Sequence, residues 1–345
     1  MGVKITDLLE PTEIEIESLK DKVIAIDAAN HLYMFLSSIR QADGQLLTDS
    51  KGRVTSHLTG LFSRSTNLMK QGIKLVYVFD GPAPELKKRE RERRRKLKEE
   101  ALVQYEKATE EGNVEDMKKY AARTSRLSSE MIAEAKKLVI AMGLPMIEAP
   151  CEGEAQAAFM TTKGDAYAAS SQDADSLLFG GKRFIRNLSI TGKRKMPGKL
   201  NYVNVKPELI TLQDVLGKLG INQEQLIHLG ILTGTDYDPG GIKGIGQKKA
   251  LKLVVEYKDN YSAMYKHAKW EEAFDFEWKE VYDLIKNMKT REDYNLEWKS
   301  VDGEAIGKLL IDEHDFSRER VESNIKALLE ETNKIKQQGL KKWFG

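Results

Sequence analysis

Short runs of β-branched and aromatic residues recur along the first half of the chain and predict buried strands. Three of these runs are "KVIAID" ending at Asp27, "KLVYVFD" ending at Asp80 and "DAYAASSQD" ending at Asp173, and a fourth is "KRFIRN". Helical patterns lie between the first strands. One of them, residues 56–72, closes on Gly72, a residue typical of helix C-termini.

Alternating strands and helices predict an α/β fold with a mostly parallel, twisted central sheet flanked by helices. Such sheets bind ligands outside the carboxyl ends of their strands, and three of the predicted strands run straight into an aspartate there. A charged helical excursion, broken near "EEGNVED", follows from about residue 86 to 131. From about residue 210 we expect mainly helices, with a glycine-rich hairpin, "GGIKGIGQKKALKLV", between two of them.

Composition narrows the class of protein only a little. The chain has 345 residues, 41% of them hydrophobic, which is enough for one large domain or two smaller ones. A formal net charge of +2 does not by itself indicate a nucleic-acid-binding protein. The single cysteine, Cys151, excludes an internal disulfide and favours a reducing compartment. No apolar run approaches the roughly 20 residues of a membrane span, and no signal peptide opens the chain, so we expect an intracellular protein without a membrane partner.

Seven acidic residues stand at the ends of apolar segments, where an isolated charge is costly. Any one of them could cap a helix, but capping does not explain all seven. Crowded carboxylates repel one another unless a divalent cation lies between them. Because the donors are all oxygens and Cys151 has no partner at metal-ligand spacing, Mg²⁺ or Mn²⁺ is favoured over zinc. The seven are Asp27, Asp80, Glu152, Glu154, Asp173, Asp175 and Asp236.

Seven carboxylates exceed what a single Mg²⁺ usually binds, because this ion keeps several of its waters. We therefore expect two ions about 4 Å apart, Mg²⁺ in both places with Mn²⁺ as a substitute. A pair of ions at this separation supports the cleavage of a phosphodiester.

Six motifs occur in one order along the chain: "AIDAAN", "VYVFDGPAP", "PCEGEAQAA", "SSQDADSLLFG", "LTGTDYD" and "GIKGIGQKKA". In this order and spacing they resemble the flap structure-specific endonucleases of archaea and eukaryotes, within the 5′ nuclease superfamily, over nearly the whole chain. The resemblance implies a 5′-nuclease (PIN-like) fold with a helical arch and a helix-hairpin-helix element. It also matches the seven acids one by one to the family's metal site.

The stretch "KKRERERRRKLK", residues 87–98, carries nine basic and two acidic side chains. Helical spacing puts Lys87, Arg91, Arg94 and Lys98 on one face that could bind phosphates, although a solvated helix laced with ion pairs is the alternative. By the resemblance this region is the arch. Lys87 and Arg94 would then contact the scissile phosphate and stabilise the transition state. Tyr33 would stack on the displaced nucleotide, with a place in the core as the alternative.

The glycine-rich hairpin lacks the Gly-Lys-Ser/Thr of a nucleotide-binding P-loop. Gly244 and Gly246, followed by Lys248 and Lys249, would let backbone N–H groups approach a phosphate closely. This stretch resembles a helix-hairpin-helix element that holds duplex backbone without reading sequence. In relatives such an element is often associated with K⁺, which is therefore a candidate cofactor here.

The end of the chain, "QQGLKKWFG", carries large apolar side chains where terminal residues are usually polar. Gln337, Leu340, Trp343 and Phe344 resemble the box that binds a sliding clamp of the proliferating cell nuclear antigen type, with packing on the protein's own body as the alternative. The chain stops there without the basic extension of eukaryotic relatives. We therefore expect an archaeal source, and with it a location in the cytoplasm and nucleoid; a eukaryotic source would imply the nucleus.

We expect one nuclease core, residues 1–330, followed by a clamp-binding tail, residues 331–345. The core would comprise an N-terminal nuclease region (about 1–100), the arch (about 82–131) and an internal nuclease region (about 140–260) with the helix-hairpin-helix at about 226–256. The resemblance implies hydrolysis of 5′ flaps on branched DNA, with 5′–3′ exonuclease activity, in Okazaki fragment maturation and long-patch base excision repair. A sister 5′ exonuclease or junction resolvase, and a non-catalytic clamp-tethered scaffold, are the alternatives. The short excursion favours the flap branch, because the excision-repair branch carries a longer insertion there.

Overall fold

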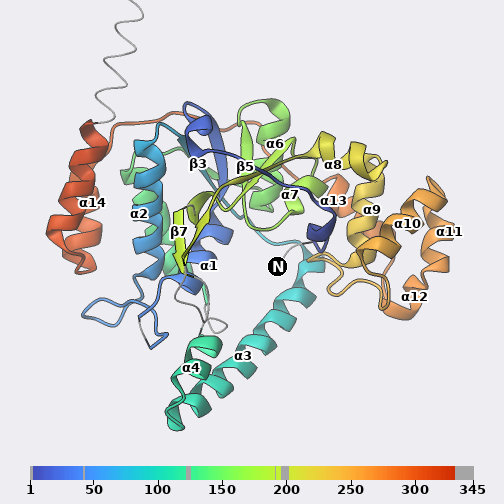
Figure 1. Cartoon of the computed structure of the whole chain (residues 1–345), viewed down its shortest axis with the longest axis horizontal. Helices are drawn as coiled ribbons and strands as arrows, with labels where there is room; N and C mark the ends of the chain where they lie inside the picture. The colour runs from blue at the N-terminus through green and yellow to red at the C-terminus, as the bar shows by residue number, and fades with distance from the viewer. Residues whose placement is uncertain (1–2, 42, 122–125, 191, 196–201, 331–345) are drawn as a thin grey trace, which may run out of the picture.

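The computed structural model describes residues 3–41, 43–121, 126–190, 192–195 and 202–330. At its centre lies a seven-stranded sheet of order β1-β9-β6-β5-β2-β3-β4 (Figure 1). The strands from β6 to β4 pair in parallel, whereas β9 and β1 join the β6 edge antiparallel. The mostly parallel sheet is therefore confirmed. The strands are β1 (Thr12–Glu13), β2 (Val23–Asp27), β3 (Lys74–Phe79), β4 (Met146–Glu148), β5 (Ala168–Ser170), β6 (Arg183–Arg186) and β9 (Glu208–Thr211). A separate hairpin joins β7 (Gly192–Lys195) to β8 (Tyr202–Val205).

The packing of strand β2 explains why its residues before Asp27 are all apolar instead of alternating with polar ones. Ile24 and Ile26 pack into one hydrophobic cluster, whereas Ala25, which points to the opposite face, packs into another. Both faces of this central strand are thus covered, as is usual for parallel sheets. Helices α1 (Ala28–Ser38), α2 (Ser56–Lys70) and α5 (Ser129–Ala141) contribute to the first cluster, and α6 (Gly153–Lys163) to the second.

A third cluster forms the core of the helical region that lies beside the sheet at the right of Figure 1. Val3 and Ile5, from the start of the chain, are buried in this cluster together with residues of the short helix after β5. The helices are α7 (Asp175–Leu178), α8 (Leu212–Leu219), α9 (Gln223–Thr233), α10 (Gln247–Tyr257), α11 (Tyr261–His267), α12 (Trp270–Ala273) and α13 (Trp278–Lys286). The chain then returns along the sheet to α14 (Gly303–Gly307), a π-helix (Lys308–Glu313) and a helix over residues 318–330.

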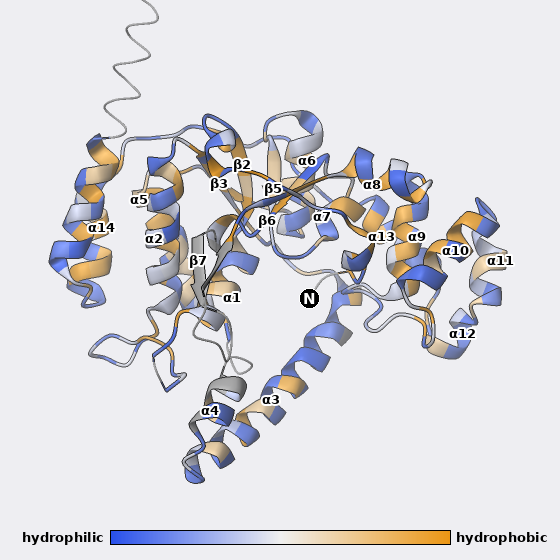
Figure 2. Ribbon diagram, in the orientation of Figure 1, coloured by the Kyte–Doolittle hydropathy of each residue, from blue (hydrophilic) through white to orange (hydrophobic). Residues whose placement is uncertain are grey.

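The charged excursion forms two contacting helices, α3 (Lys88–Glu110) and α4 (Val114–Ala121), that project from the body (Figure 1). The break between them coincides with the predicted interruption near "EEGNVED". Most of α3 is hydrophilic (Figure 2), because little of it packs against the body. No helix in the described ranges is long and apolar enough to cross a membrane.

Candidate active site

The acidic side chains predicted to bind metal line one cavity of about 360 Å³ at the carboxyl edge of the sheet. β2 ends on Asp27, and Asp80 directly follows the last residue of β3. β5 stops at Ser170, so the prediction that this strand runs straight into Asp173 is wrong, and a short loop carries this residue to the cavity. All seven acids line the cavity: Asp27, Asp80, Glu152, Glu154, Asp173, Asp175 and Asp236.

The turn before α6 brings two of these acids beside the Asp80 strand. Glu152 is the N-cap residue of α6, and the backbone N–H of Gly153 donates a hydrogen bond of 2.7 Å to Oδ1 of Asp80. A Cβ atom at position 153 would lie only 2.9 Å from that oxygen. Any other residue between Glu152 and Glu154 would therefore shift the Asp80 carboxylate or the helix start.

Burial and mutual repulsion make several of these carboxyl groups hard to ionise. Burial first, and then the charge of Asp80, raise the pKa of Asp27 to about 8. Burial and the charge of Asp236 raise the pKa of Asp175 to about 7. The pKa of Glu154 is also raised well above its usual value, by burial and by Asp175. The cavity is thus too poorly solvated for all of its carboxylates to be ionised. Bound cations would stabilise the ionised carboxylates.

Neighbouring polar groups fix the orientation of the acids, and the sequence interpretation did not assign them a role. Nδ2 of Asn30 donates to Oδ2 of Asp173 over 3.0 Å. The hydroxyl of Ser171 donates to Oε1 of Glu154 over 2.6 Å. Asn30 and Ser171 stand inside the motifs "AIDAAN" and "SSQDADSLLFG", so their position in a motif was the available signal.

The start of the chain also reaches the site. The backbone N–H of Val3 donates to Oδ1 of Asp175 over 2.5 Å. Nothing in the local sequence indicates this contact, because 172 positions separate the two residues.

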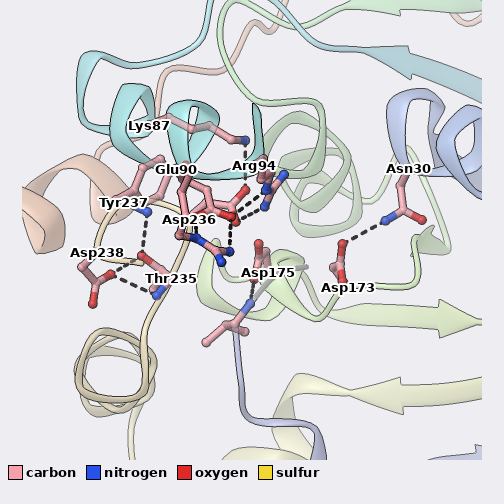
Figure 3. A network of polar contacts seen from close by, with 12 residues as sticks. Asn30, Lys87, Glu90, Arg94, Asp173, Asp175, Thr235, Asp236, Tyr237 and Asp238 are labelled. Atoms are coloured by element: carbon pink, nitrogen blue, oxygen red, sulfur yellow. Dashed lines mark hydrogen bonds and ion pairs between the residues drawn. The ribbon is translucent and has the colours of Figure 1, made fainter. Parts of the chain in front are cut away.

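Two basic side chains from the base of the arch lie among the acids (Figure 3). Nζ of Lys87 is 2.6 Å from Oε2 of Glu152 and 3.4 Å from Oδ2 of Asp236. Nη2 of Arg94 is 2.5 Å from Oδ1 of Asp236. Burial favours the neutral form of Lys87, but Glu152 and Asp236 outweigh it and raise its pKa above the usual value. Within the described ranges no three His, Cys, Asp or Glu side chains are arranged as ligands of a metal ion. Glu152 and Asp236 contact Lys87 and Arg94 instead.

The predicted basic face of the arch lines the same region. A second cavity, of about 420 Å³, is lined by Lys87, Arg91, Arg94 and Lys98 together, so the four side chains do share one face. Tyr33 lines both cavities and is 41% exposed, which excludes a place in the core. Nζ of Lys98 lies 5.0 Å from the centroid of the Tyr33 ring.

The glycine-rich hairpin connects α9 to α10 and lines a cavity of about 770 Å³. Gly244 has a φ of +83°, a value that favours glycine, and Gly246 is the N-cap residue of α10. Lys248 and Lys249 follow in the first turn and are exposed. The prediction that glycines form a hairpin between two helices is therefore confirmed, whereas the approach of its N–H groups to a phosphate stays a prediction. The predicted clamp-binding residues Gln337, Leu340, Trp343 and Phe344 lie outside the described residues.

Two family models match the chain: the XPG N-terminal domain over residues 1–101 and the XPG I-region over residues 143–236. Flap endonuclease 1 from Pyrococcus abyssi is 53% identical over 344 residues, which cover 100% of this chain and 98% of that protein. The chain belongs to the flap endonuclease 1 family. The family resemblance stated from the six motifs is thus confirmed.

Two solved structures have the same fold as this member of the flap endonuclease 1 family. Flap endonuclease-1 from Methanococcus jannaschii matches with a TM-score of 0.76 and 39% identity, over 96% of this chain and 100% of that one. The catalytic core of Rad2 in complex with a DNA substrate matches with a TM-score of 0.67 and 24% identity, over 95% of this chain and 100% of that one. At that identity the Rad2 likeness shows only the fold. Nucleases of the flap endonuclease type hydrolyse phosphodiester bonds and generally depend on a metal, which suits the crowded carboxylates of the cavity.

Proposed function

We propose that this chain is a structure-specific DNA endonuclease that cleaves 5′ flaps near their junction with duplex, with 5′–3′ exonuclease activity. One observation carries the proposal: seven carboxylates, three basic arch residues and an exposed aromatic ring line a single cavity. A non-catalytic DNA-binding scaffold has no use for such a buried cluster of acids. The activity would serve Okazaki fragment maturation and long-patch base excision repair.

We infer that the acids hold two Mg²⁺ ions, for which Mn²⁺ can substitute. Their donor atoms are all oxygens, which both ions prefer. Oε1 of Glu152 is buried without a hydrogen-bond partner among the described residues, so it is available to a cation. When bound, two divalent cations supply positive charge to the phosphate and lower the pKa of water. The proposed ligands, directly or through water, are Asp27, Asp80, Glu152, Glu154, Asp173, Asp175 and Asp236.

The remaining cavity residues would orient the substrate. Lys87 and Arg94 bring permanent positive charge into a poorly solvated site, where it acts strongly on a phosphate that gains charge in the transition state. The exposed face of Tyr33 would stack on the displaced nucleotide. Arg91 and Lys98 would neutralise neighbouring phosphates of the flap.

The hairpin would hold the duplex at a distance from the cavity. The N–H groups around Gly244 and Gly246 and the charges of Lys248 and Lys249 suit phosphate oxygens and carry no base specificity. K⁺ is a candidate ligand of the same element. Residues Gln337 to Phe344 would tether the enzyme to a sliding clamp of the proliferating cell nuclear antigen type. We place the enzyme with chromosomal DNA, in the cytoplasm and nucleoid of an archaeon.

A panel of labelled substrates tests the proposal. The protein is incubated with Mg²⁺, with or without EDTA, and one of three substrates with identical arms. The substrates are a 5′-flap duplex, a blunt duplex and a four-way junction. We expect Mg²⁺-dependent cleavage of the flap substrate near its junction, leaving a 5′-phosphate and a 3′-hydroxyl. Asp175→Ala should bind the flap but lose more than about a thousandfold in rate. Preferred cleavage of the four-way junction would indicate a junction resolvase, and binding without cleavage by the unaltered protein would indicate a scaffold.

A further inference from the structure

One carboxylate in the basic stretch is buried. Glu90 is only 2% exposed, although it belongs to α3, a helix that is otherwise mostly charged and exposed. The other acidic residue of the stretch, Glu92, is exposed. A buried carboxylate costs free energy unless it is paired, and it repels the phosphates that this face is proposed to bind. Glu90 therefore needs an explanation other than solubility.

The partners of Glu90 are two consecutive arginines. Its carboxylate accepts hydrogen bonds from Nε and Nη2 of Arg93, over 2.7 and 2.8 Å, and from Nε of Arg94, over 2.6 Å. Burial favours the neutral acid, but these bonds outweigh it and lower the pKa of Glu90 below its usual value. The group is therefore an ionised acceptor at neutral pH.

The bond to Arg94 decides which edge of its guanidinium faces the cavity. A guanidinium is planar, so fixing its Nε edge also fixes the directions of its Nη donors. With Nε held by Glu90, Nη2 reaches Oδ1 of Asp236 at 2.5 Å (Figure 3). Arg94 lines the cavity of the seven acids, whereas Arg93 does not.

We propose that Glu90 is a positioning residue that aims the guanidinium of Arg94 into the catalytic cavity. This inference rests on the proposed flap cleavage. Without Glu90, the long side chain of Arg94 would sample rotamers that point out of the cavity. The loss of orientation would slow the chemical step. Arg93 donates to both oxygens of the carboxylate, sharing Oε1 with Arg94, and neutralises its charge.

Two simpler roles for Glu90 make different predictions. If Glu90 only reduced the positive charge of the arch, its removal would tighten DNA binding and leave the rate unchanged or higher. If it only supported the helix through pairs at positions i+3 and i+4, its removal would lower arch stability without any special dependence on Arg94. A positioning role predicts a slower chemical step that depends on the presence of Arg94.

The test compares Glu90→Ala and Glu90→Gln with the matched control Glu92→Gln on the same helix. Single-turnover cleavage rates and dissociation constants are measured on the flap substrate, and circular dichroism checks the fold. We expect both Glu90 variants to cleave at least about tenfold more slowly at unchanged or tighter binding. Glu92→Gln should match the unaltered protein. Equal rates for Glu90→Ala and the unaltered protein would overturn the inference, and Glu90→Gln supplies the same comparison if the alanine variant folds poorly.

A double-mutant cycle with Arg94→Ala separates positioning from a structural role. Glu90→Ala should have almost no effect on the rate in the Arg94→Ala background, because there is no guanidinium left to aim. An equal slowing in both backgrounds would overturn the inference. Flap cleavage by the unaltered protein is the reference throughout: its absence would sink the proposed function itself, whereas normal cleavage with unaffected Glu90 variants would sink only the role of Glu90.

Discussion

The ammonium group of Lys87 lies 2.6 Å from Oε2 of Glu152, at the place where we expect a divalent cation. The arch residue therefore acts as a counter-ion of the acids in the DNA-free protein. It would have to release Glu152 when a cation and a phosphate enter the cavity. Lys87 thus has two opposing effects, because it competes with the cation before the reaction and stabilises phosphate charge during it.

Replacing Lys87 should separate these two effects. Lys87→Ala is expected to lower the single-turnover rate by about 10² to 10³-fold, the usual cost of removing one preorganised donor. The same variant should bind Mn²⁺ more tightly in the absence of DNA, because the competing ammonium is gone. Isothermal titration calorimetry checks the second effect. Lys88→Ala is the matched control, since the Lys88 side chain is 67% exposed and pairs only with Glu85, which is also exposed, among its described contacts. Weaker Mn²⁺ binding by Lys87→Ala would contradict the competition.

Metal binding should release protons at neutral pH. The folded, metal-free chain has a pKa of about 8 at Asp27 and about 7 at Asp175, both raised from 3.8. Because the folded state binds these protons more tightly than the unfolded state, the stability of the metal-free protein falls as pH rises from about 4 to 8. A cation displaces the protons, so its affinity should rise over the same range.

Calorimetry in two buffers of different ionisation enthalpy measures this proton release. We expect at least about one proton per chain at pH 7, falling toward zero above about pH 9. Asp175→Asn keeps an oxygen acceptor for the Val3 N–H and should release fewer protons. A release that does not change between pH 6 and 9 would mean that these carboxyl groups are already ionised before the cation binds.

The hairpin lysines should contribute binding and not catalysis. The Lys248→Ala, Lys249→Ala double variant is expected to weaken flap binding and to reduce the slope of log K against log salt by about 2, roughly one unit per lost phosphate contact. The cleavage rate at saturating protein should stay the same. Lys252→Ala is the control, because Lys252 is exposed on α10 but does not line the hairpin cavity. An unchanged salt slope in the double variant would remove the hairpin from the duplex interface.

The terminal segment should matter only in the presence of a clamp. Deleting residues 337–345 is expected to leave clamp-free flap cleavage intact and to abolish both clamp binding and stimulation. The substitution Phe344→Ala should weaken binding in the same direction, since buried aromatic anchors dominate such small interfaces. Surface plasmon resonance with immobilised clamp measures the binding. Full clamp binding by the truncated chain would show that another surface carries the contact.

The sequence predicted those elements that are encoded within a few neighbouring residues. The apolar runs before Asp27 and Asp80 are strands β2 and β3, and the helix closing on Gly72 is α2, with Gly72 at a φ of +77° just beyond it. The pattern missed β4 and the antiparallel strands β1 and β9. These strands have two to four residues each, and each directly follows a proline, a residue that is more typical of a turn or loop than of a strand.

The chemistry expected of the site could be predicted from the kinds of residues in the motifs. Carboxylates before turns, when they occur together with a basic helix, have few other uses. Which groups touch was decided only by the tertiary structure. Lys87 and Glu152 are 65 positions apart, and Val3 and Asp175 are 172 apart. Glu90 and Glu92 look alike in the sequence, yet only Glu90 is buried. Local spacing fixes which face of a helix or strand a side chain occupies. The distance between two elements depends instead on how the parallel strands and their crossovers pack, and no short stretch of sequence encodes that packing.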